Sequence, residues 1–139
     1  MRVRQLSVFI ENKAGRITEI TDILGEGGFQ IRGFAVADTA DFGILRLIVD
    51  QPDDATALLK ARGFTVRETE IICVELEDRT GELSRVLKVV SDAGVNVEYV
   101  YSLVGTYIAL SVGDVERAIE LLEHEPVRLV RQEELAART

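Results

Sequence analysis

Hydrophobic positions along the chain change their spacing in a fixed order, and that order occurs twice. Leu6, Val8 and Ile10 alternate along the chain, which is typical of a strand with one buried face. Behind Gly15 the apolar residues recur at helical spacing until a cluster of glycines, which is expected to end a helix. The same succession of spacings returns from Ile72 onward. The pattern therefore predicts two copies of one folding unit.

Each copy is predicted to contain a strand, a helix, two strands, a helix and a strand. In the first copy we expect these elements at residues 6–10, 15–24, 29–36, 44–49, 52–62 and 64–68. In the second copy we expect them at residues 72–77, 81–93, 95–103, 106–112, 114–123 and 127–131. Glycines 25, 27 and 28 are expected to stop the first helix, and Asp114 to cap the last one. The residues after Arg131 form a polar tail with room for one helical turn.

This order of elements is the split βαβ, or ferredoxin-like, arrangement, an α+β fold in which two helices cover one face of an antiparallel sheet. The predicted domains are residues 1–68 and 69–139. The junction Arg67–Glu70 has no Gly/Ser or Pro-rich linker, so we expect the two units to pack rigidly side by side.

The two copies align at an offset of 66 residues without a gap through the first half of each unit. Identities are few, and they include Glu11/Glu77, Gly15/Gly81 and Gly28/Gly94. A residue needed only once for chemistry should break the repeat, whereas architecture and duplicated sites should preserve it. The repeat can therefore be used to sort candidate functional residues.

Composition narrows the class of protein. The 139 residues carry a net charge of −8, which argues against a nucleic-acid-binding surface, and 47% of them are hydrophobic, enough for a packed core. No stretch is long and apolar enough to span a bilayer, and none resembles a signal peptide. The single cysteine fits a reducing compartment. We therefore expect a cytoplasmic protein that contacts neither nucleic acid nor membrane.

Comparison of the two copies argues against a catalytic role for the cysteine and the histidine. Cys73 falls opposite Ser7 inside a predicted strand, and His124, the only histidine, is expected at the end of the last helix. One His and one Cys cannot supply a zinc site or a Ser-His-Asp arrangement within one chain. Phosphate-binding and dinucleotide-binding glycine motifs are absent. The sequence thus predicts no enzyme, no metal and no cofactor.

The loop between the first strand and the first helix is present in both copies. It contains Asn12 and Gly15 in the first copy and Asp78 and Gly81 in the second. Free N–H groups at a helix start can receive a carboxylate, and a glycine lets it approach closely. An Asn or Asp side chain can accept a hydrogen bond from an ammonium group. The same residues are also ordinary turn and cap residues, so local chemistry leaves both interpretations open.

The βαββαβ order with Asn/Asp-x-x-Gly-x-Ile/Leu after the first strand and Gly-x-Asn/Gln-Ile/Val at the second resembles the ACT domain. The likeness extends from about Val3 to Leu135, and it is to a family of stand-alone tandem ACT proteins without a catalytic domain. ACT modules are small sensors, generally of amino acids, in regulators of metabolic enzymes. The resemblance implies a non-catalytic protein that binds an amino acid, with a regulated metabolic enzyme as a further partner.

The resemblance also implies a pocket between two ACT units, formed by the loop of one unit and the start of the second strand of the other. The first pocket would combine Asn12, Ala14, Gly15, Arg16 and Ile17 with Asn96 and Val97. The second would combine Asp78, Thr80, Gly81, Glu82 and Leu83 with Gln30 and Ile31.

Charges differ between the two predicted pockets. Arg16 is replaced by Glu82, and Asn12 by Asp78. We therefore expect unequal sites, with the Asn12 loop the better site for a carboxylate. Tyr99 and Tyr101 replace Gly33 and Ala35, and either line a ligand pocket or fill a packing interface. The Asp38–Phe42 segment has no counterpart of equal length in the second copy, and is either a pocket cover or a longer turn.

The sheet face away from the helices also carries alternating apolar residues, Phe9, Ile44 and Ile48. Something is expected to cover that face, and a homodimer is the economical explanation. Two other functions remain open from sequence. One is a protein-interaction module with vestigial pockets, and the other is an acylphosphatase-like enzyme that uses the Asn12/Arg16 loop.

Overall fold

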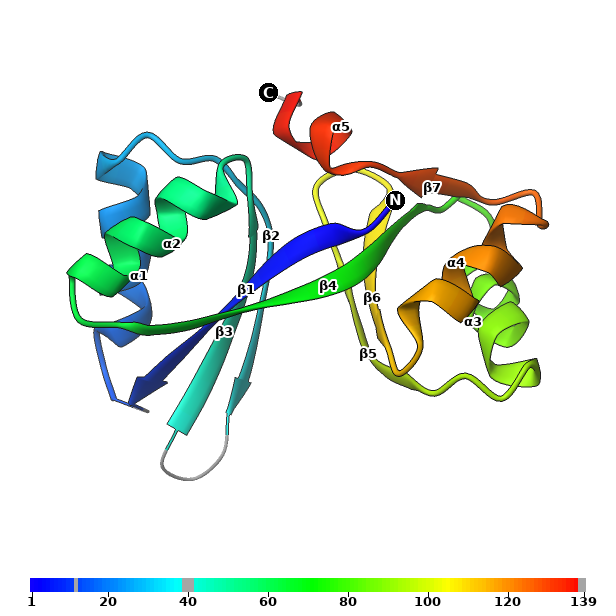
Figure 1. The fold of residues 1–139 in the computed structure, drawn as a ribbon, viewed down its shortest axis with the longest axis horizontal. Coiled ribbons are helices and arrows are strands. Elements are labelled where there is room, and N and C mark those ends of the chain that lie inside the picture. Colours follow the sequence, from blue (N-terminus) through cyan, green and yellow to red (C-terminus); the bar gives the residue numbers. More distant parts are fainter. Residues whose placement is uncertain (12, 39–41, 138–139) are drawn as a thin grey trace. The chain divides into compact units, whose positions relative to one another are not determined.

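The computed structural model describes residues 1–11, 13–38 and 42–137, and it confirms the α+β class (Figure 1). The chain forms two compact units. The N-terminal unit contains residues 4–69 and the chain end from Leu135, and the C-terminal unit contains residues 1–3 and 70–134. That the sequence repeat divides between residues 68 and 69 stays a prediction. In the structure, the first three residues belong to the C-terminal unit and the residues from Leu135 belong to the N-terminal unit.

The N-terminal unit consists of β1 (Val3–Glu11), α1 (Arg16–Glu26), β2 (Ile31–Asp38), β3 (Phe42–Val49), α2 (Pro52–Ala61) and the first part of β4 (Thr65–Glu75). Its strands lie in the order β2-β3-β1-β4, with β3 antiparallel to both neighbours. Both helices cover one face of this sheet (Figure 1). This is the predicted ferredoxin-like arrangement.

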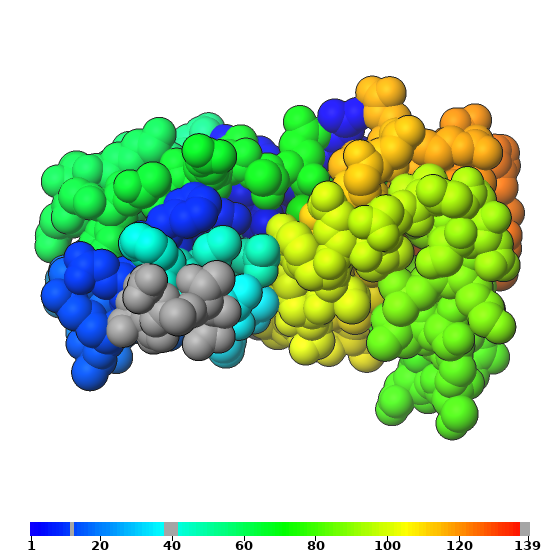
Figure 2. Space-filling model, turned by 90° about the horizontal axis from the view of Figure 1, so that it is seen from below, coloured from blue at the N-terminus to red at the C-terminus, as the bar shows by residue number. Residues whose placement is uncertain are grey.

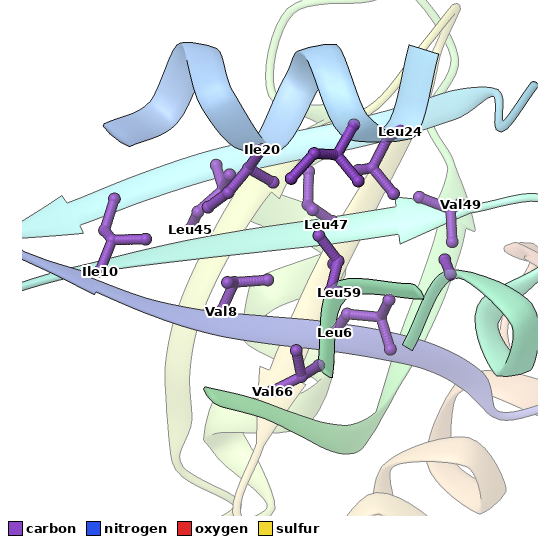
Figure 3. Close-up of a cluster of buried hydrophobic side chains, with 12 residues drawn as sticks. Leu6, Val8, Ile10, Ile20, Leu24, Leu45, Leu47, Val49, Leu59 and Val66 are labelled. Atoms are coloured by element: carbon purple, nitrogen blue, oxygen red, sulfur yellow. The ribbon is translucent and has the colours of Figure 1, made fainter. Parts of the chain in front are cut away.

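The core of the N-terminal unit lies between that sheet face and the two helices. Leu6, Val8 and Ile10 of β1 point to the helix side, as their alternation predicts, and meet Ile20 and Leu24 of α1 (Figure 3). Since Leu6 and Leu47 pair directly across β1 and β3, their side chains lie on the same face.

The C-terminal unit repeats this plan with the second part of β4, α3 (Glu82–Asp92), β5 (Val97–Ser102), β6 (Tyr107–Val112), α4 (Val115–Glu123) and β7 (Arg128–Val130). Its strand order is β5-β6-β4-β7. Ile72 and Val74 of β4 pack in a core with Val86 and Val90 of α3. Asp114 caps α4 as predicted, because its carboxylate accepts the Arg117 N–H at 3.0 Å.

Three details differ from the sequence prediction. The strands expected at 64–68 and 72–77 form one strand, β4, so the junction Arg67–Glu70 is itself extended backbone. Gly25 lies inside α1, and the helix ends at Glu26 with Gly27 as its cap, so Gly25 does not stop it. The polar tail forms α5 (Gln132–Ala137), whose Leu135 is buried.

Irregularities of the backbone recur with the repeat. The pairing of β2 with β3 shifts register between Ile31 and Gly33, and that of β5 with β6 shifts between Val97 and Tyr99. Both shifts therefore occur 66 residues apart, at the start of the second strand of each unit. No helix among the described residues is long and apolar enough to cross a membrane.

Candidate functional site

The two strand-to-helix loops have the same backbone hydrogen bonds. In the N-terminal unit the Lys13 N–H donates to the Glu11 carbonyl at 2.8 Å. In the C-terminal unit the Arg79 N–H donates to the Glu77 carbonyl at the same distance. The loop that the repeat comparison selected is thus duplicated in three dimensions as well as in sequence.

Each loop ends in a glycine with a left-handed backbone. Gly15 has φ 87° and ψ −9°, and Gly81 has φ 87° and ψ −4°. Each glycine is the N-cap of its helix, and neither helix start receives a side-chain cap. The Arg16 and Glu82 N–H groups donate to the Lys13 and Arg79 carbonyls at 3.4 Å, whereas the N–H groups of the next residue, Ile17 in α1 and Leu83 in α3, face no side-chain cap. An external acceptor can approach these groups, and the partial positive charge of the helix start favours an anion there.

A hollow of about 810 Å³ lies beside the loop of the C-terminal unit. One wall is the loop, the second is the exposed face of α3, and the third is the end of the β5–β6 hairpin. The loop and the exposed side of α3, within the yellow-green segment of Figure 2, lie at the surface of their unit. The hollow is lined by Leu76, Glu77, Asp78, Arg79, Gly81, Glu82, Leu83, Ser84, Leu87, Lys88, Ser91, Ser102, Gly105, Thr106, Tyr107 and Ile108.

Four of the five residues predicted from the second loop line this hollow, namely Asp78, Gly81, Glu82 and Leu83. The fifth, Thr80, is exposed in the same loop. Leu83 keeps 42% of its surface exposed although it is a large apolar residue, and its repeat partner Ile17 keeps 40%. An exposed apolar side chain at the second position of each helix provides an apolar contact next to the free N–H groups.

Residues of the first predicted pocket are less completely described. Asn12 lies outside the described residues, Ala14 and Gly15 are exposed, and Arg16 is half-buried.

At the second strands, the Gln30 N–H donates to the Asp50 carboxylate at 3.0 Å, and the Asn96 carbonyl accepts the Gly113 N–H at 2.9 Å. Ile31 and Val97 begin β2 and β5, respectively. The combination of Asn96 and Val97 with the first loop, and of Gln30 and Ile31 with the second, stays a prediction.

Ion pairs at the two helix starts have opposite polarity. On α1 the Arg16 guanidinium lies 3.0 Å from the Glu19 carboxylate. On α3 the Glu82 carboxylate lies 3.0 Å from the Arg85 guanidinium. The substitution of Arg16 by Glu82 is thus accompanied by the reverse substitution three residues later, so each pair remains neutral.

The Glu82 side chain is buried and paired with two guanidinium groups. Its side chain keeps 9% of its surface exposed, and Arg79 contacts it at 3.1 Å in addition to Arg85. The hydrogen bond from Arg85, aided by the charge of Arg79, lowers the pKa of the Glu82 carboxyl, against the opposing effect of burial. Glu82 therefore orders the loop through its two guanidinium partners, and its predicted ligand contact stays a prediction.

Sequence comparison of the two copies does not single out the α3 residues that line the hollow beyond the loop. Ser84, Lys88 and Ser91 follow one another at spacings of four and three, so they lie on one face of the helix. That polar spacing is visible in the sequence, but it is equally typical of an ordinary solvated face.

Tyr99 and Tyr101 stack on each other with ring centroids 6.3 Å apart. They pair across the sheet with Ser111 and Ala109. Cys73 also pairs with Ala109, and burial raises the pKa of its thiol to about 12, which keeps it protonated. The tyrosines do not line the hollow described above, while their role elsewhere stays open.

Comparison with known proteins gives matches that extend over almost the whole chain. The family model described as "ACT domain pair" matches residues 1–138. A crystal structure of a protein from Bacteroides thetaiotaomicron is similar with a TM-score of 0.93 and 35% identity, covering 99% of this chain and 98% of the other.

More distant structures share the fold. The regulatory subunit of aspartate kinase from Thermus thermophilus has a TM-score of 0.64 at 15% identity, and the match covers 86% of this chain and 90% of the other. Aspartate kinase from Clostridium acetobutylicum has a TM-score of 0.53 at 14% identity, and the match covers 86% of this chain and 32% of the other. The comparison with curated protein sequences gave no match.

Replacing either loop glycine should reveal the cost of the left-handed turn. A Cβ at Gly15 or Gly81 would meet no atom within 4 Å, so the cost of Gly15→Ala and Gly81→Ala comes from placing a Cβ on a left-handed backbone and not from a clash with neighbours. We expect each to lower the free energy of unfolding by about 1 kcal/mol, by similar amounts in the two loops. Urea denaturation of each variant measures this.

Gly25→Ala is the matched control, because Gly25 is helical and a Cβ there also meets open space. It should raise stability by about 0.5 kcal/mol, since alanine favours a helix interior. Equal destabilisation by all three substitutions would contradict a special backbone requirement at the loops.

The ion pairs of Glu82 predict a pH-dependent contribution to stability. Because the folded state lowers the Glu82 pKa below its ordinary value of 4.5, the stabilisation is present above that value and is lost as pH falls through the lowered value. We expect Glu82→Gln to reduce the urea midpoint at about pH 7, and to reduce it less at about pH 3, where the stabilisation from the lowered pKa is weaker.

Glu120→Gln is the control, since Glu120 is exposed and faces Arg117 at 3.6 Å in a single pair. It should change the midpoint little at either pH. An effect of Glu82→Gln that persists undiminished in acid would show that the ion pairs are not its cause.

Proposed function

Because the chain belongs to the ACT domain pair family, we propose that it is a non-catalytic regulatory protein that binds a free amino acid. The observation that carries this proposal is the strand-to-helix loop, which occurs twice with one backbone geometry and leaves each helix start uncapped. The left-handed backbone explains a glycine at each turn, and the open space beside Gly15 and Gly81 leaves room for a ligand to approach that backbone.

The loop of the C-terminal unit suits the two charged groups shared by all amino acids. The N–H groups at the start of α3, next to Gly81, can donate to an α-carboxylate. Asp78, at the other end of the loop, can accept hydrogen bonds from an α-ammonium group. Leu83 and Leu76 add an apolar contact. A zwitterion therefore matches the hollow better than an anion or a cation alone.

An acylphosphatase-like activity fits the first loop poorly. Such an enzyme would need a free guanidinium to hold a phosphate, and the Arg16 guanidinium lies 3.0 Å from the Glu19 carboxylate and 3.7 Å from that of Glu11. Two carboxylates this close compete with any phosphate for the same donors.

Regulation requires that binding change something else. We propose that the amino acid shifts the conformation or assembly of the chain and so the activity of a metabolic enzyme, because binding can alter an equilibrium only by stabilising one state over another. The aspartate kinase regulatory subunit of the same fold is an example of a separate chain with a regulatory role.

The two sites are proposed to be unequal. The expectation that the first loop is the better carboxylate site rested on Arg16, whose charge is balanced by Glu19 in the same way as that of Glu82 is balanced by Arg85. The remaining contrast is Asn12 against Asp78, a neutral and a charged acceptor for the ammonium group. Titration calorimetry in which two equal sites appear would contradict the inequality.

We further propose a cytoplasmic homodimer. Self-association is supported by β2, an edge strand of its sheet on which Phe34 keeps 67% and Val36 keeps 49% of its surface exposed. An edge strand with apolar residues and without proline is a ready template for pairing with another copy. The cytoplasm is supported by the single, buried cysteine.

Ligand binding is tested by screening the twenty amino acids for thermal stabilisation. At a ligand concentration about 100 times Kd, the melting temperature should rise by about 5 to 10 °C. Asp78→Ala should weaken binding at the C-terminal site by about tenfold or more, because it removes a charge-assisted hydrogen bond. Asp54→Ala, which replaces an exposed acid of α2, is the control and should leave binding unchanged.

Absence of stabilisation by every amino acid would contradict the proposal and favour an interaction module with vestigial pockets.

The homodimer is tested by sedimentation velocity of the purified chain. We expect a dimer at micromolar concentration and a shift toward monomer in Phe34→Lys, which places a charge on the exposed edge. A monomer for the unmodified chain would contradict the dimer. A Phe34→Lys variant that stays fully dimeric would contradict β2 as the contact between the two copies.

A further inference from the structure

We propose that the hollow of the C-terminal unit selects an amino acid with an acidic side chain, and that Lys88 of α3 is the selecting residue. The inference rests on the proposed function, in which the loop at Asp78 and Gly81 holds the α-ammonium and α-carboxylate groups. It adds which side chain the ligand carries and which residue recognises it.

Charged residues around the hollow divide into paired and unpaired groups. Arg79 lies 2.9 Å from Glu77 and 3.1 Å from Glu82, and the Arg85 guanidinium lies 3.0 Å from Glu82, so these two carboxylates are matched by two guanidinium groups. Of the charged lining residues in the described part of the chain, Asp78 and Lys88 are the two whose side chains make no ion pair or hydrogen bond. The hollow therefore offers one free negative and one free positive group to a ligand.

Asp78 lies in the loop, whereas Lys88 lies further along α3. Lys88 is six residues beyond Glu82, which places its Cα about 9 Å further along the helix axis. Helical side chains lean toward the N-terminus, so the Lys88 ammonium reaches back toward the loop. A ligand held at the helix start by its α-carboxylate would place the end of a two- or three-carbon side chain within reach of that ammonium.

The rest of the wall suits a polar side chain. Ser84 and Ser91 lie on the same face of α3 as Lys88, and Ser102 and Thr106 contribute hydroxyl groups from the hairpin. A carboxylate there would gain a charge-assisted contact with Lys88 and hydroxyl donors. A basic side chain would meet the lysine charge, and an apolar one would cover hydroxyl groups without bonding to them.

The repeat supports a role specific to the C-terminal unit. The position of Lys88 is occupied by Asp22 in the first copy, and Ser84 and Ser91 correspond to Thr18 and Gly25. Asp22 is exposed on α1, as Lys88 is exposed on α3. A residue needed in only one unit is expected to break the repeat, as Lys88 does.

Titration calorimetry of the full chain with matched ligand pairs tests the inference. Aspartate against asparagine, and glutamate against glutamine, differ in side-chain charge and little in shape. We expect the better acid to bind about tenfold more tightly than its amide, and lysine to bind most weakly. Lys88→Met should reduce the preference for the acid to about twofold while leaving affinity for the amide unchanged.

Two control variants locate the effect. Lys60→Met removes an exposed lysine from α2 and should preserve the preference in full. Asp22→Asn alters the corresponding position of the first copy and should also preserve it. Loss of the preference in Asp22→Asn rather than in Lys88→Met would assign the selection to the other unit and overturn the proposal.

Remaining outcomes separate this inference from the function on which it rests. If amino acids bind but acids are no tighter than their amides, the choice of side chain is wrong and the amino-acid sensor stands. If Lys88→Met weakens acid and amide equally, Lys88 holds the α-carboxylate and does not read the side chain, which also overturns the proposal. If no amino acid binds, the proposed function fails.

Discussion

The site depends on a single backbone constraint, the left-handed glycine that joins the first strand of each unit to its first helix. At φ near 87°, Gly15 and Gly81 reverse the chain in a loop of a few residues, and the helix starts directly afterwards without a side-chain cap. A side chain with a Cβ would strain this turn, and a conventional Ser or Asp cap would occupy the N–H groups that the turn leaves open. The same constraint thus shapes the strand-to-helix connection and keeps the donors of the helix start accessible.

Strand β4 links this local constraint to the organisation of the chain. Residues 65–69 complete the sheet of the N-terminal unit, and residues 70–75 begin that of the C-terminal unit, within one unbroken strand. The chain ends are likewise exchanged between the units: residues 1–3 belong to the C-terminal unit, and residues from Leu135 belong to the N-terminal unit. Neither repeat therefore closes its unit with its own residues alone, and a chain cut at the repeat boundary would lose one chain end from each unit.

Much of this architecture is predictable from the sequence, because spacing of apolar residues directly reports which side of a strand or helix is buried. Leu6, Val8 and Ile10 behave as their alternation predicts, and Asp114 caps α4. The junction at Arg67–Glu70 was less accessible, since four polar residues in a row have no apolar period that distinguishes an extended strand from a turn.

The site was only partly predictable. The loop glycines stand out because both copies contain them. Lys88 differs from its counterpart Asp22, and the sequence alone does not distinguish it from a lysine that only keeps the surface soluble. The opposite charges of Arg16 and Glu82 suggested two pockets of opposite charge. In the structure each charge is balanced by a neighbour, Glu19 beside Arg16 and Arg85 beside Glu82, so this contrast is smaller than the sequence suggested.

That inverted pair has a consequence for how the two halves can diverge or be exchanged. Replacing Arg16 by the glutamate of the other copy would set two acids at positions i and i+3, and replacing Glu82 by arginine would add a third guanidinium next to Arg79 and Arg85. Exchange of a single residue between the two halves would therefore lower stability, whereas exchange of the whole loop and first helical turn would keep each ion pair intact. The two charges of each helix start are therefore coupled, so a change of one charge without the other is expected to destabilise that helix start.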